Sequence, residues 1–234
     1  TGDCFKFVML KYDISFTQAC KIIAHDFGIS FAGPIPTRKE LPIKMIEKIR
    51  HAEFEYQEKT FDSDYWDQFN ITKDILTEYN VAQIQWVKGN TWNGKVECLP
   101  DNPIFCYKYP SGRVRFYRPK TTSLKHFGNV CRDDVFGMNQ LDNGPIVICA
   151  GQKDVLSLYA NTGIRGISLN SESATLEKSV YLELRKITDD IFVCYDNDET
   201  GYKYMNIIAN AYNIKPIKLV DVYPNLPVKE DLSW

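Results

Sequence analysis

The second half of the chain is organised around one stretch, Ile191-Phe192-Val193-Cys194-Tyr195-Asp196-Asn197-Asp198-Glu199-Thr200-Gly201. Its apolar beginning predicts a buried strand that runs directly into two aspartates and a helix. Residues two apart on a strand project to the same side, so Asp196 and Asp198 are expected to point together from the carboxyl end of a parallel strand. Open α/β sheets bind their ligands at that end.

The pattern leaves two interpretations of these aspartates open. Two unit charges about 4 Å apart repel each other by about 4 kcal/mol at an effective dielectric constant of about 20, so the pair favours a bound cation. Ligation by oxygen atoms alone favours Mg²⁺ or Mn²⁺. The other interpretation is a solvated loop in which the acids cap the following helix.

The residues around this stretch alternate between strand and helix patterns. The predicted strands are residues 145–149, 166–169, 190–195 and 216–219, and the predicted helices are residues 154–161, 176–186 and 199–212. Strands that alternate with helices at this spacing predict an α/β fold with a parallel sheet and right-handed crossovers.

The residues before this region predict a mixed α+β arrangement. Predicted strands lie at residues 81–87, 104–109 and 113–117, with a turn at residues 110–112, and predicted helices lie at residues 43–58, 64–69 and 72–79. An amphipathic helix is expected at residues 19–27, ending at Gly28. The segment 28–42 is rich in proline and glycine and predicts a linker between that helix and the rest of the chain.

Composition and charge exclude several classes of protein. The 234 residues carry 28 Lys and Arg against 30 Asp and Glu, so binding to nucleic acid requires a local basic patch. Seven cysteines are an odd number, none pairs in a C-x-x-C motif, and no apolar run reaches the roughly 18 residues of a membrane span. We therefore expect a cytoplasmic protein with no disulfide framework, and the scattered histidines predict no zinc site within this chain.

A local basic run is present before the parallel sheet. It is interleaved with aromatic residues and comprises Arg113, Arg115, Arg118, Lys120 and Lys125. Alternation along a hairpin strand places Arg113 and Arg115 on one face, as a surface that follows phosphates requires. An ordinary solvated strand face has the same pattern.

The chain as a whole resembles the DnaG-type DNA primases of bacteria and phages, including those fused to a replicative helicase. The resemblance is carried by Thr1-Gly2-Asp3-Cys4-Phe5 through Ile29, by Arg118-Pro119-Lys120, Ser123-Leu124-Lys125 and Val135-Phe136-Gly137, by Asp196-Asn197-Asp198, and by Lys229-Glu230-Asp231-Leu232. It implies the C-terminal part of a zinc-binding-type domain at residues 1–30, a linker and helix at 31–60, a basic α+β lobe at 61–143 and a TOPRIM domain at 144–234. Zn²⁺ is expected only in an upstream domain that this sequence does not include.

The resemblance also implies roles for individual residues. Asp196 and Asp198 match the metal-binding Asp-x-Asp motif of the family, and Asp154 matches a further family acid. Ala150 stands where the family has a glutamate, and a methyl group neither binds Mg²⁺ nor accepts a proton. Glu172 lies after the next predicted strand and is our candidate for the missing carboxylate. The residues expected to contact DNA or nucleotide are Arg113, Arg115, Arg118, Lys120, Lys125 and Lys153.

The function expected from this resemblance is synthesis of RNA primers on single-stranded DNA by Mg²⁺- or Mn²⁺-dependent nucleotidyl transfer. The partners would be the template, ribonucleoside triphosphates and a replicative helicase, either fused or separate. Ala150 favours an alternative, a catalytically impaired TOPRIM module that binds DNA within a primase-helicase. A TOPRIM nuclease is a third interpretation, against which the basic lobe argues.

Overall fold

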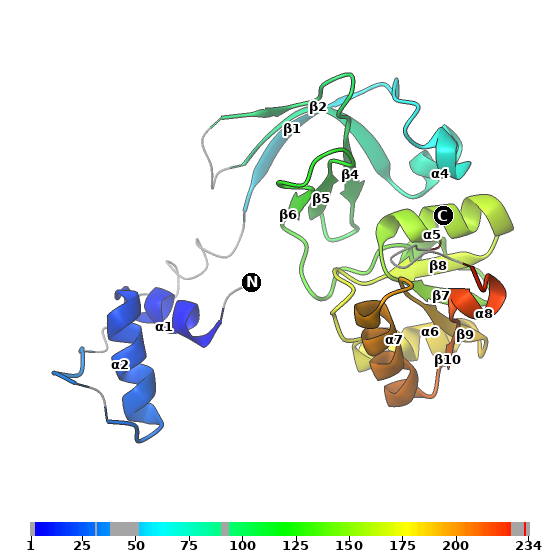
Figure 1. The fold of residues 1–234 in the computed structure, drawn as a ribbon. Coiled ribbons are helices and arrows are strands. Elements are labelled where there is room, and N and C mark those ends of the chain that lie inside the picture. The colour runs from blue at the N-terminus through cyan, green and yellow to red at the C-terminus, as the bar shows by residue number, and fades with distance from the viewer. Residues whose placement is uncertain (1–2, 31, 38–51, 90–93, 226–231, 233–234) are drawn as a thin grey trace. The chain divides into compact units, whose positions relative to one another are not determined.

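The computed structural model describes residues 3–30, 32–37, 52–89, 94–225 and 232 (Figure 1). The chain divides into two compact units, Thr1–Glu53 and Phe54–Trp234. The domain boundaries expected at residues 30, 60 and 143 stay predictions.

The first unit contains two helices, α1 (Cys4–Tyr12) and α2 (Phe16–Asp26). Each begins at a capping side chain, Asp3 for α1 and Ser15 for α2, that accepts a hydrogen bond from a backbone N–H in the first turn. Helix α2 confirms the helix predicted for residues 19–27. Helix α1 was not predicted, because its apolar residues do not gather on one face and none of them is buried.

The second unit begins with an antiparallel sheet. Its strand order is β1-β2-β4-β5-β6, and β3 pairs with β2. The strands are β1 (Phe54–Lys59), β2 (Val81–Gly89), β3 (Val96–Glu97), β4 (Ile104–Lys108), β5 (Val114–Tyr117) and β6 (His126–Gly128). The strands predicted at residues 81–87, 104–109 and 113–117 are confirmed. Gly112 closes the turn between β4 and β5 with a φ of +78°, a left-handed conformation that favours glycine.

Two short helices connect β1 to β2. They are the 3-10 helix η1 (Asp67–Phe69) and α4 (Lys73–Glu78). The Thr72 side chain accepts a hydrogen bond from the Ile75 N–H and caps α4. The helix predicted at residues 72–79 is therefore confirmed, whereas only residues 67–69 of the one predicted at residues 64–69 are helical, as a single 3-10 turn.

The helix predicted for residues 43–58 is wrong over residues 54–58, which belong to strand β1. Phe54 and Tyr56 alternate with polar residues, and their ring centroids lie 5.3 and 5.5 Å from that of Phe116 on β5. Packing on this half-buried sheet surface outweighs the helical tendency of the charged residues between them. Residues 43–51 of the prediction lie outside the described residues.

The second half of this unit is a parallel sheet of order β10-β9-β7-β8. The 3-10 helix η2 (Met138–Gln140) precedes it. The elements are β7 (Ile146–Cys149), α5 (Gln152–Thr162), β8 (Arg165–Ser168), α6 (Lys178–Ile187), β9 (Ile191–Cys194), α7 (Glu199–Tyr212), β10 (Lys215–Pro216) and α8 (Leu219–Val222). The predicted alternation of strands and helices is confirmed.

The last predicted strand, residues 216–219, is corrected at its end. Lys215 and Pro216 pair with β9, but Leu219 begins the helical turn α8. The Leu219 side chain is buried in the core, and its carbonyl accepts a hydrogen bond from the Tyr223 N–H. Burial of Leu219 therefore accompanies a turn of the chain rather than an extension of the strand.

Helices cover both faces of the parallel sheet (Figure 1). Val147 and Cys149 of β7 pack in the same cluster as α5, whereas Ile146 and Ile148 pack with α6 and α7. Successive residues of a strand face opposite sides of the sheet. The apolar residues of β7 therefore pack in the hydrophobic clusters on both faces of the parallel sheet.

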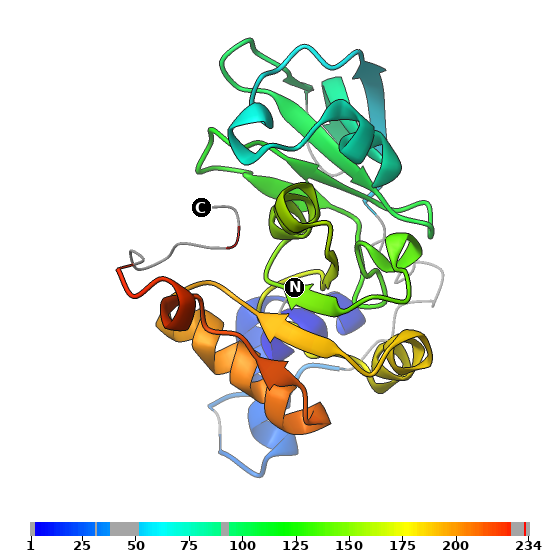
Figure 2. The same ribbon diagram turned by 90° about the vertical axis from the view of Figure 1, so that its right-hand side faces the viewer.

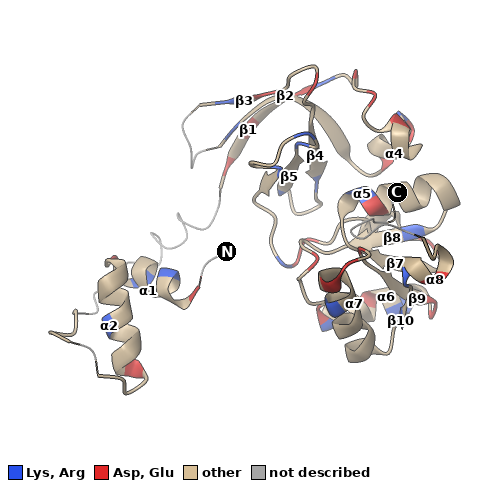
Figure 3. Cartoon of the chain, in the orientation of Figure 1, with Lys and Arg blue, Asp and Glu red and all other residues tan. Residues whose placement is uncertain are grey.

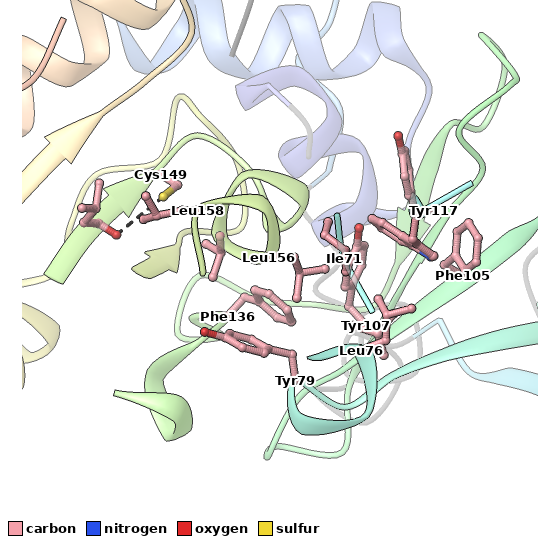
Figure 4. Close-up of a cluster of buried hydrophobic side chains, with 14 of the residues drawn as sticks. Ile71, Leu76, Tyr79, Phe105, Tyr107, Tyr117, Phe136, Cys149, Leu156 and Leu158 are labelled. Atoms are coloured by element: carbon pink, nitrogen blue, oxygen red, sulfur yellow. Dashed lines mark hydrogen bonds between the residues drawn. The ribbon is translucent and has the colours of Figure 1, made fainter. Parts of the chain in front are cut away.

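Helix α5 lies between the two sheets (Figure 2). One buried cluster joins Leu156 of α5 to Phe105, Tyr107 and Tyr117 of the antiparallel sheet and to Cys149 of the parallel sheet (Figure 4). The two sheets therefore share a core, which fixes the antiparallel strands relative to the ends of the parallel ones. Within the described ranges, no helix combines the length and the apolar composition that a membrane crossing requires.

Candidate functional site

A hollow of about 400 Å³ lies between the antiparallel sheet and the carboxyl ends of the parallel strands. The antiparallel side contributes Tyr107, Arg115, Tyr117, Lys125 and His126. The parallel side contributes Ala150, Gly151, Gln152, Lys153, Asp154, Leu169, Asn170, Ser171, Glu172 and Asp196. Cationic side chains thus share one hollow with carboxylates at the strand ends where α/β sheets bind ligands.

The end of strand β9 places the two predicted aspartates differently. Asp196 lines the hollow, whereas Asp198 caps α7 by accepting a hydrogen bond from the Gly201 N–H at 2.8 Å. Asn197 between them is buried, and its side-chain oxygen accepts a hydrogen bond from the Tyr202 hydroxyl. The helix-cap interpretation is therefore confirmed for Asp198, whereas a cation at Asp196 stays a prediction.

The end of strand β7 lies between those of β8 and β9, and Ala150 occupies it. Asp154, in the first turn of α5, is only 4% exposed. Its carboxylate accepts a hydrogen bond from the Gly151 N–H at 2.9 Å and so holds the turn that follows Ala150. The central strand end thus presents a methyl group to the hollow, with a carboxylate one helical turn later.

The end of strand β8 leads to Glu172, which also lines the hollow. Arg115 of β5 donates a hydrogen bond to the Asn170 carbonyl, which ties this loop to the antiparallel sheet. Burial, together with the negative charge of Asp198, raises the pKa of Glu172. Burial is the larger of the two causes, so Glu172 ionises less readily than an exposed glutamate does.

The structure separates the predicted basic residues into two groups. Arg115, Lys125 and Lys153 line the hollow, whereas Arg113, Arg118 and Lys120 do not. Arg113 instead forms an ion pair of 3.4 Å with the buried carboxylate of Asp134. Figure 3 shows the basic residues of the hairpin strands in blue and the acidic start of α7 in red.

Sequence reasoning missed the aromatic wall of the hollow. The ring centroids of Tyr117 and His126 lie 4.8 Å apart in a stacked arrangement. Desolvation, together with the charges of Arg115 and Lys125, lowers the pKa of His126 to about 4, so its ring is neutral near pH 7. Tyr117 was predictable, because it shares a strand face with Arg115 two residues earlier. His126 was not, because its place depends on the pairing of β5 with β6 across an irregular loop.

The acidic side chains fit a hard divalent cation by their chemistry. Asp154, Glu172 and Asp196 all line the hollow, and Glu172 Oε1 is buried with no hydrogen-bond partner among the described residues. Across the described ranges, no three His, Cys, Asp or Glu side chains are grouped so that they alone could hold a metal ion. Mg²⁺ fits such a site, because it usually takes one or two carboxylates and completes its shell with waters and substrate phosphates.

The comparison with protein families finds one match, in the C-terminal part of the chain. The model of the family described as Toprim-like matches residues 147–233. This segment is therefore similar to the Toprim-like family. It holds the four acids considered above, Asp154, Glu172, Asp196 and Asp198, whereas Arg115 and Lys125 precede the matched residues.

Solved primase structures share the fold of the chain. A crystal structure of the Aquifex aeolicus primase, with its zinc-binding and RNA polymerase domains, matches 99% of this chain and 66% of that one, at 15% identity and a TM-score of 0.52. The primase fragment of the bacteriophage T7 primase-helicase matches 78% of this chain and 70% of that one, at 17% identity and a TM-score of 0.50. The DnaG primase catalytic domain bound to single-stranded DNA matches 72% of this chain and 66% of that one, at 13% identity and a TM-score of 0.50.

These comparisons confirm the predicted fold class and, at the level of the fold, the resemblance to DnaG-type primases. The chain spans 66% to 70% of the length of these three structures. A comparison with curated protein sequences finds no match.

Proposed function

We propose that the chain is the core of a DnaG-type primase that synthesises RNA primers on single-stranded DNA by Mg²⁺-dependent nucleotidyl transfer. The observation that carries this proposal is the hollow of about 400 Å³. Arg115 and Lys125 line it from the antiparallel sheet, and Asp196 and Glu172 line it from the parallel sheet. Cations on one wall suit the phosphates of template and nucleotide, and acids on the other suit a divalent ion. The shared fold with primases, one of them bound to single-stranded DNA, supports the same assignment.

The basic wall would bind and orient phosphate groups. The guanidinium of Arg115 has five N–H donors, one of which is directed to the Asn170 carbonyl, so the group is held in place before a ligand arrives. Lys125 supplies a second, exposed charge. Contacts to phosphate fix position and orientation but carry no sequence information, so this wall would place the template without selecting its sequence.

Asp196 and Asp198 would hold Mg²⁺, with Asp154 and Glu172 as further carboxylates that line the hollow. When bound, the ion would neutralise triphosphate charge and activate the primer 3′-hydroxyl. The Asp198 side chain also orders the first turn of α7, so the cap keeps the Asp196–Asp198 turn in one conformation. Ribonucleoside triphosphates and the DNA template are the proposed substrates.

A replicative helicase is the proposed protein partner. The support is the likeness to the primase fragment of the bacteriophage T7 primase-helicase. The motif at residues 229–232, which contributes to the family resemblance, lies outside the described residues except for Leu232.

The test is primer synthesis on a mixed-sequence single-stranded template with labelled ribonucleotides and Mg²⁺ or Mn²⁺. The assay is run with and without an added primase zinc-binding domain, because template recognition in the family depends on that domain. We expect labelled oligoribonucleotides that disappear when EDTA is added. Template binding without product under every condition would contradict the proposal.

That contradictory result would favour the alternative, a module that binds DNA but has lost synthesis. The observation on its side is the methyl group of Ala150 at the central strand end, where a carboxylate would lie closest to both neighbouring strands. Binding of single-stranded DNA does not separate the two functions, because the basic wall serves both.

The contribution of the basic wall can be measured by salt dependence. Replacing Lys125 with alanine removes one phosphate contact, which should reduce the slope of log K against log salt for single-stranded DNA by about 0.7 and weaken binding about fivefold at about 0.1 M salt. Fluorescence anisotropy of a labelled oligonucleotide at several salt concentrations gives both values. Lys186→Ala, on the exposed face of α6, removes the same charge outside the hollow and should leave the slope unchanged. Equal slopes for the two variants would exclude Lys125 from the DNA surface.

A further inference from the structure

His126 and Tyr117 form an aromatic stack at the edge of the antiparallel sheet. They are direct cross-strand partners in the register of β5 and β6, and the planes of their rings lie 14° apart. Among the described strands, β6 is the last on this side of the sheet (Figure 1). His126 therefore has a strand neighbour on one side only, and its ring lies on that neighbour.

Tyr117 gives this stack a fixed base. It is only 5% exposed, and its hydroxyl shares a hydrogen bond of 2.7 Å with the hydroxyl of Tyr65. The ring centroids of Trp66 and Tyr107 each lie 6.3 Å from its own. A ring held on several sides has little freedom to lose when a ligand binds, which lowers the cost of binding.

His126 differs from Tyr117, because it stays exposed although one face of its ring is covered. Residues two apart on a strand share a face, and the residue two positions after His126 is Gly128, which has no side chain to cover the ring. His126 also lines the hollow. Part of its uncovered surface is therefore available to a ligand in the hollow.

Two cations lie beside this stack. Lys125 directly precedes His126, and Arg115 shares a strand face with Tyr117, two residues later. Both cations line the hollow, and both are close enough to His126 to contribute to its lowered pKa. A ligand that suits this arrangement has a planar ring for the stack and negative charge for the cations, and a nucleotide has both.

We propose that a nucleobase stacks on His126 in the hollow while its phosphate contacts Arg115 or Lys125. This inference rests on the proposed function, because it assigns a base contact to the same site. The contact would tolerate any base, since every base has a π-face. The base belongs either to a ribonucleoside triphosphate or to the single-stranded template, and the test separates these two sources.

The test compares ligands with and without a base on the full chain, at one Mg²⁺ concentration. Calorimetry measures binding of ATP and of inorganic tripolyphosphate, and fluorescence anisotropy measures binding of a labelled oligothymidylate and of the same strand with abasic sites. His126→Ala should weaken ATP or the oligothymidylate by about fivefold or more, the lower end of what one base–aromatic stack contributes. The base-free ligand of the same pair should keep its wild-type affinity.

The two pairs of ligands identify the source of the base. A loss confined to ATP assigns the stack to the nucleotide, and a loss confined to the oligothymidylate assigns it to the template. Losses for both would mean that either base can occupy the His126 ring.

A second variant separates stacking from other roles of the imidazole. His126→Phe keeps a flat ring on Tyr117 and removes both ring nitrogens, so it should bind the base-bearing ligands at least as tightly as the wild type does. Tyr223→Ala removes an exposed aromatic ring outside the hollow and should change none of the four affinities.

Wild-type affinity for both base-bearing ligands in His126→Ala would overturn the inference. Equal losses with and without a base, or a loss in His126→Phe as large as in His126→Ala, would also overturn it, because the imidazole would then act on phosphate or through its nitrogens. Failure of wild-type protein to bind either ATP or the oligothymidylate would overturn both this inference and the proposed function.

The inference and the proposed function can also fail separately. If primers are made and His126→Ala binds all four ligands normally, only the stacking role is wrong. If His126→Ala selectively weakens the base-bearing ligands but the wild type makes no primers, the stacking site stands and the primase assignment falls.

Discussion

Replacing Asp196 and Asp198 together with asparagine is expected to lower primer synthesis by at least about 10²-fold. Loss of a single preorganised group that stabilises charge in a transition state costs on the order of 10²- to 10³-fold, and this change removes two negative charges from the proposed cation site. Product formation on a single-stranded template, with saturating Mg²⁺ and ribonucleotides, measures the loss.

The asparagine variant should fold normally, which makes the loss interpretable. Asp198 caps α7 through a side-chain oxygen that accepts the Gly201 N–H. Asparagine retains an oxygen at that position and is about as favourable as aspartate as an N-cap. Chemical denaturation should therefore show a free energy of unfolding close to that of the wild type.

The same strand offers a matched control at its other end. Asp189 and Asp190 precede β9, both are exposed, and Asp189 forms a surface ion pair with Arg185. Replacing Asp189 and Asp190 with asparagine also removes two negative charges, but at the end of the strand that lies away from the hollow. Loss of the surface ion pair between Asp189 and Arg185 should change stability little. Full activity in Asp196→Asn/Asp198→Asn, or an equal loss in the control, would exclude the two aspartates as the proposed cation ligands.

Much of the parallel-sheet region was predictable because its signals are local. Helix α7 begins and ends where predicted, at Glu199 and Tyr212, since Asp198 supplies a cap and the apolar residues repeat on one face. The buried strands β7 and β9 are continuous apolar runs between turn signals. Their placement in one parallel sheet followed from the alternation with helices.

The errors arose where packing outweighs local preference. Strand β1 carries charged residues of high helical tendency, yet Phe54 and Tyr56 hold it to the sheet by packing on Phe116. The helical turn at Leu219 depends on a core to which the antiparallel lobe also contributes. Neither contact is visible in the residues next to it in sequence.

The types of residue that form the site were predictable from the sequence. Which of them line the hollow, and which pair elsewhere, was not. Arg113 and Arg115 have the same spacing signal, and only the fold shows that Asp134, 21 residues after Arg113, pairs with one of them while the other reaches the Asn170 carbonyl. Asp196 and Asp198 likewise share one motif, but a cap hydrogen bond from Gly201 distinguishes them. Partners distant in sequence decide which charge faces the hollow.

Gly201 connects the helix to the aspartate turn, and its replacement by alanine is expected to lower primer synthesis about 10²-fold. A Cβ atom at this position would lie 2.2 Å from the Asp196 carbonyl oxygen and 3.0 Å from the Asp196 nitrogen, where ordinary contacts are 3.4 to 4 Å. The backbone of Asp196 and the first turn of α7 must therefore separate by about 1 Å, a displacement that costs about 10²-fold when it moves a catalytic group. The Gly201 N–H also donates to Asp198, so both aspartates move.

The same substitution should lower the free energy of unfolding. Forcing a methyl group into a closely packed contact costs about 1–3 kcal/mol, and the gain in helix propensity from glycine to alanine offsets at most about 1 kcal/mol of it. Asn206→Ala, on an exposed position of the same helix, gains propensity without the clash and should be neutral or slightly stabilised, with full activity. Chemical denaturation and primer synthesis on both variants test this. An active, stable Gly201→Ala variant would mean that the turn between β9 and α7 accommodates a side chain without moving Asp196. The close approach of Gly201 to the Asp196 backbone would then not set the position of the proposed cation ligands.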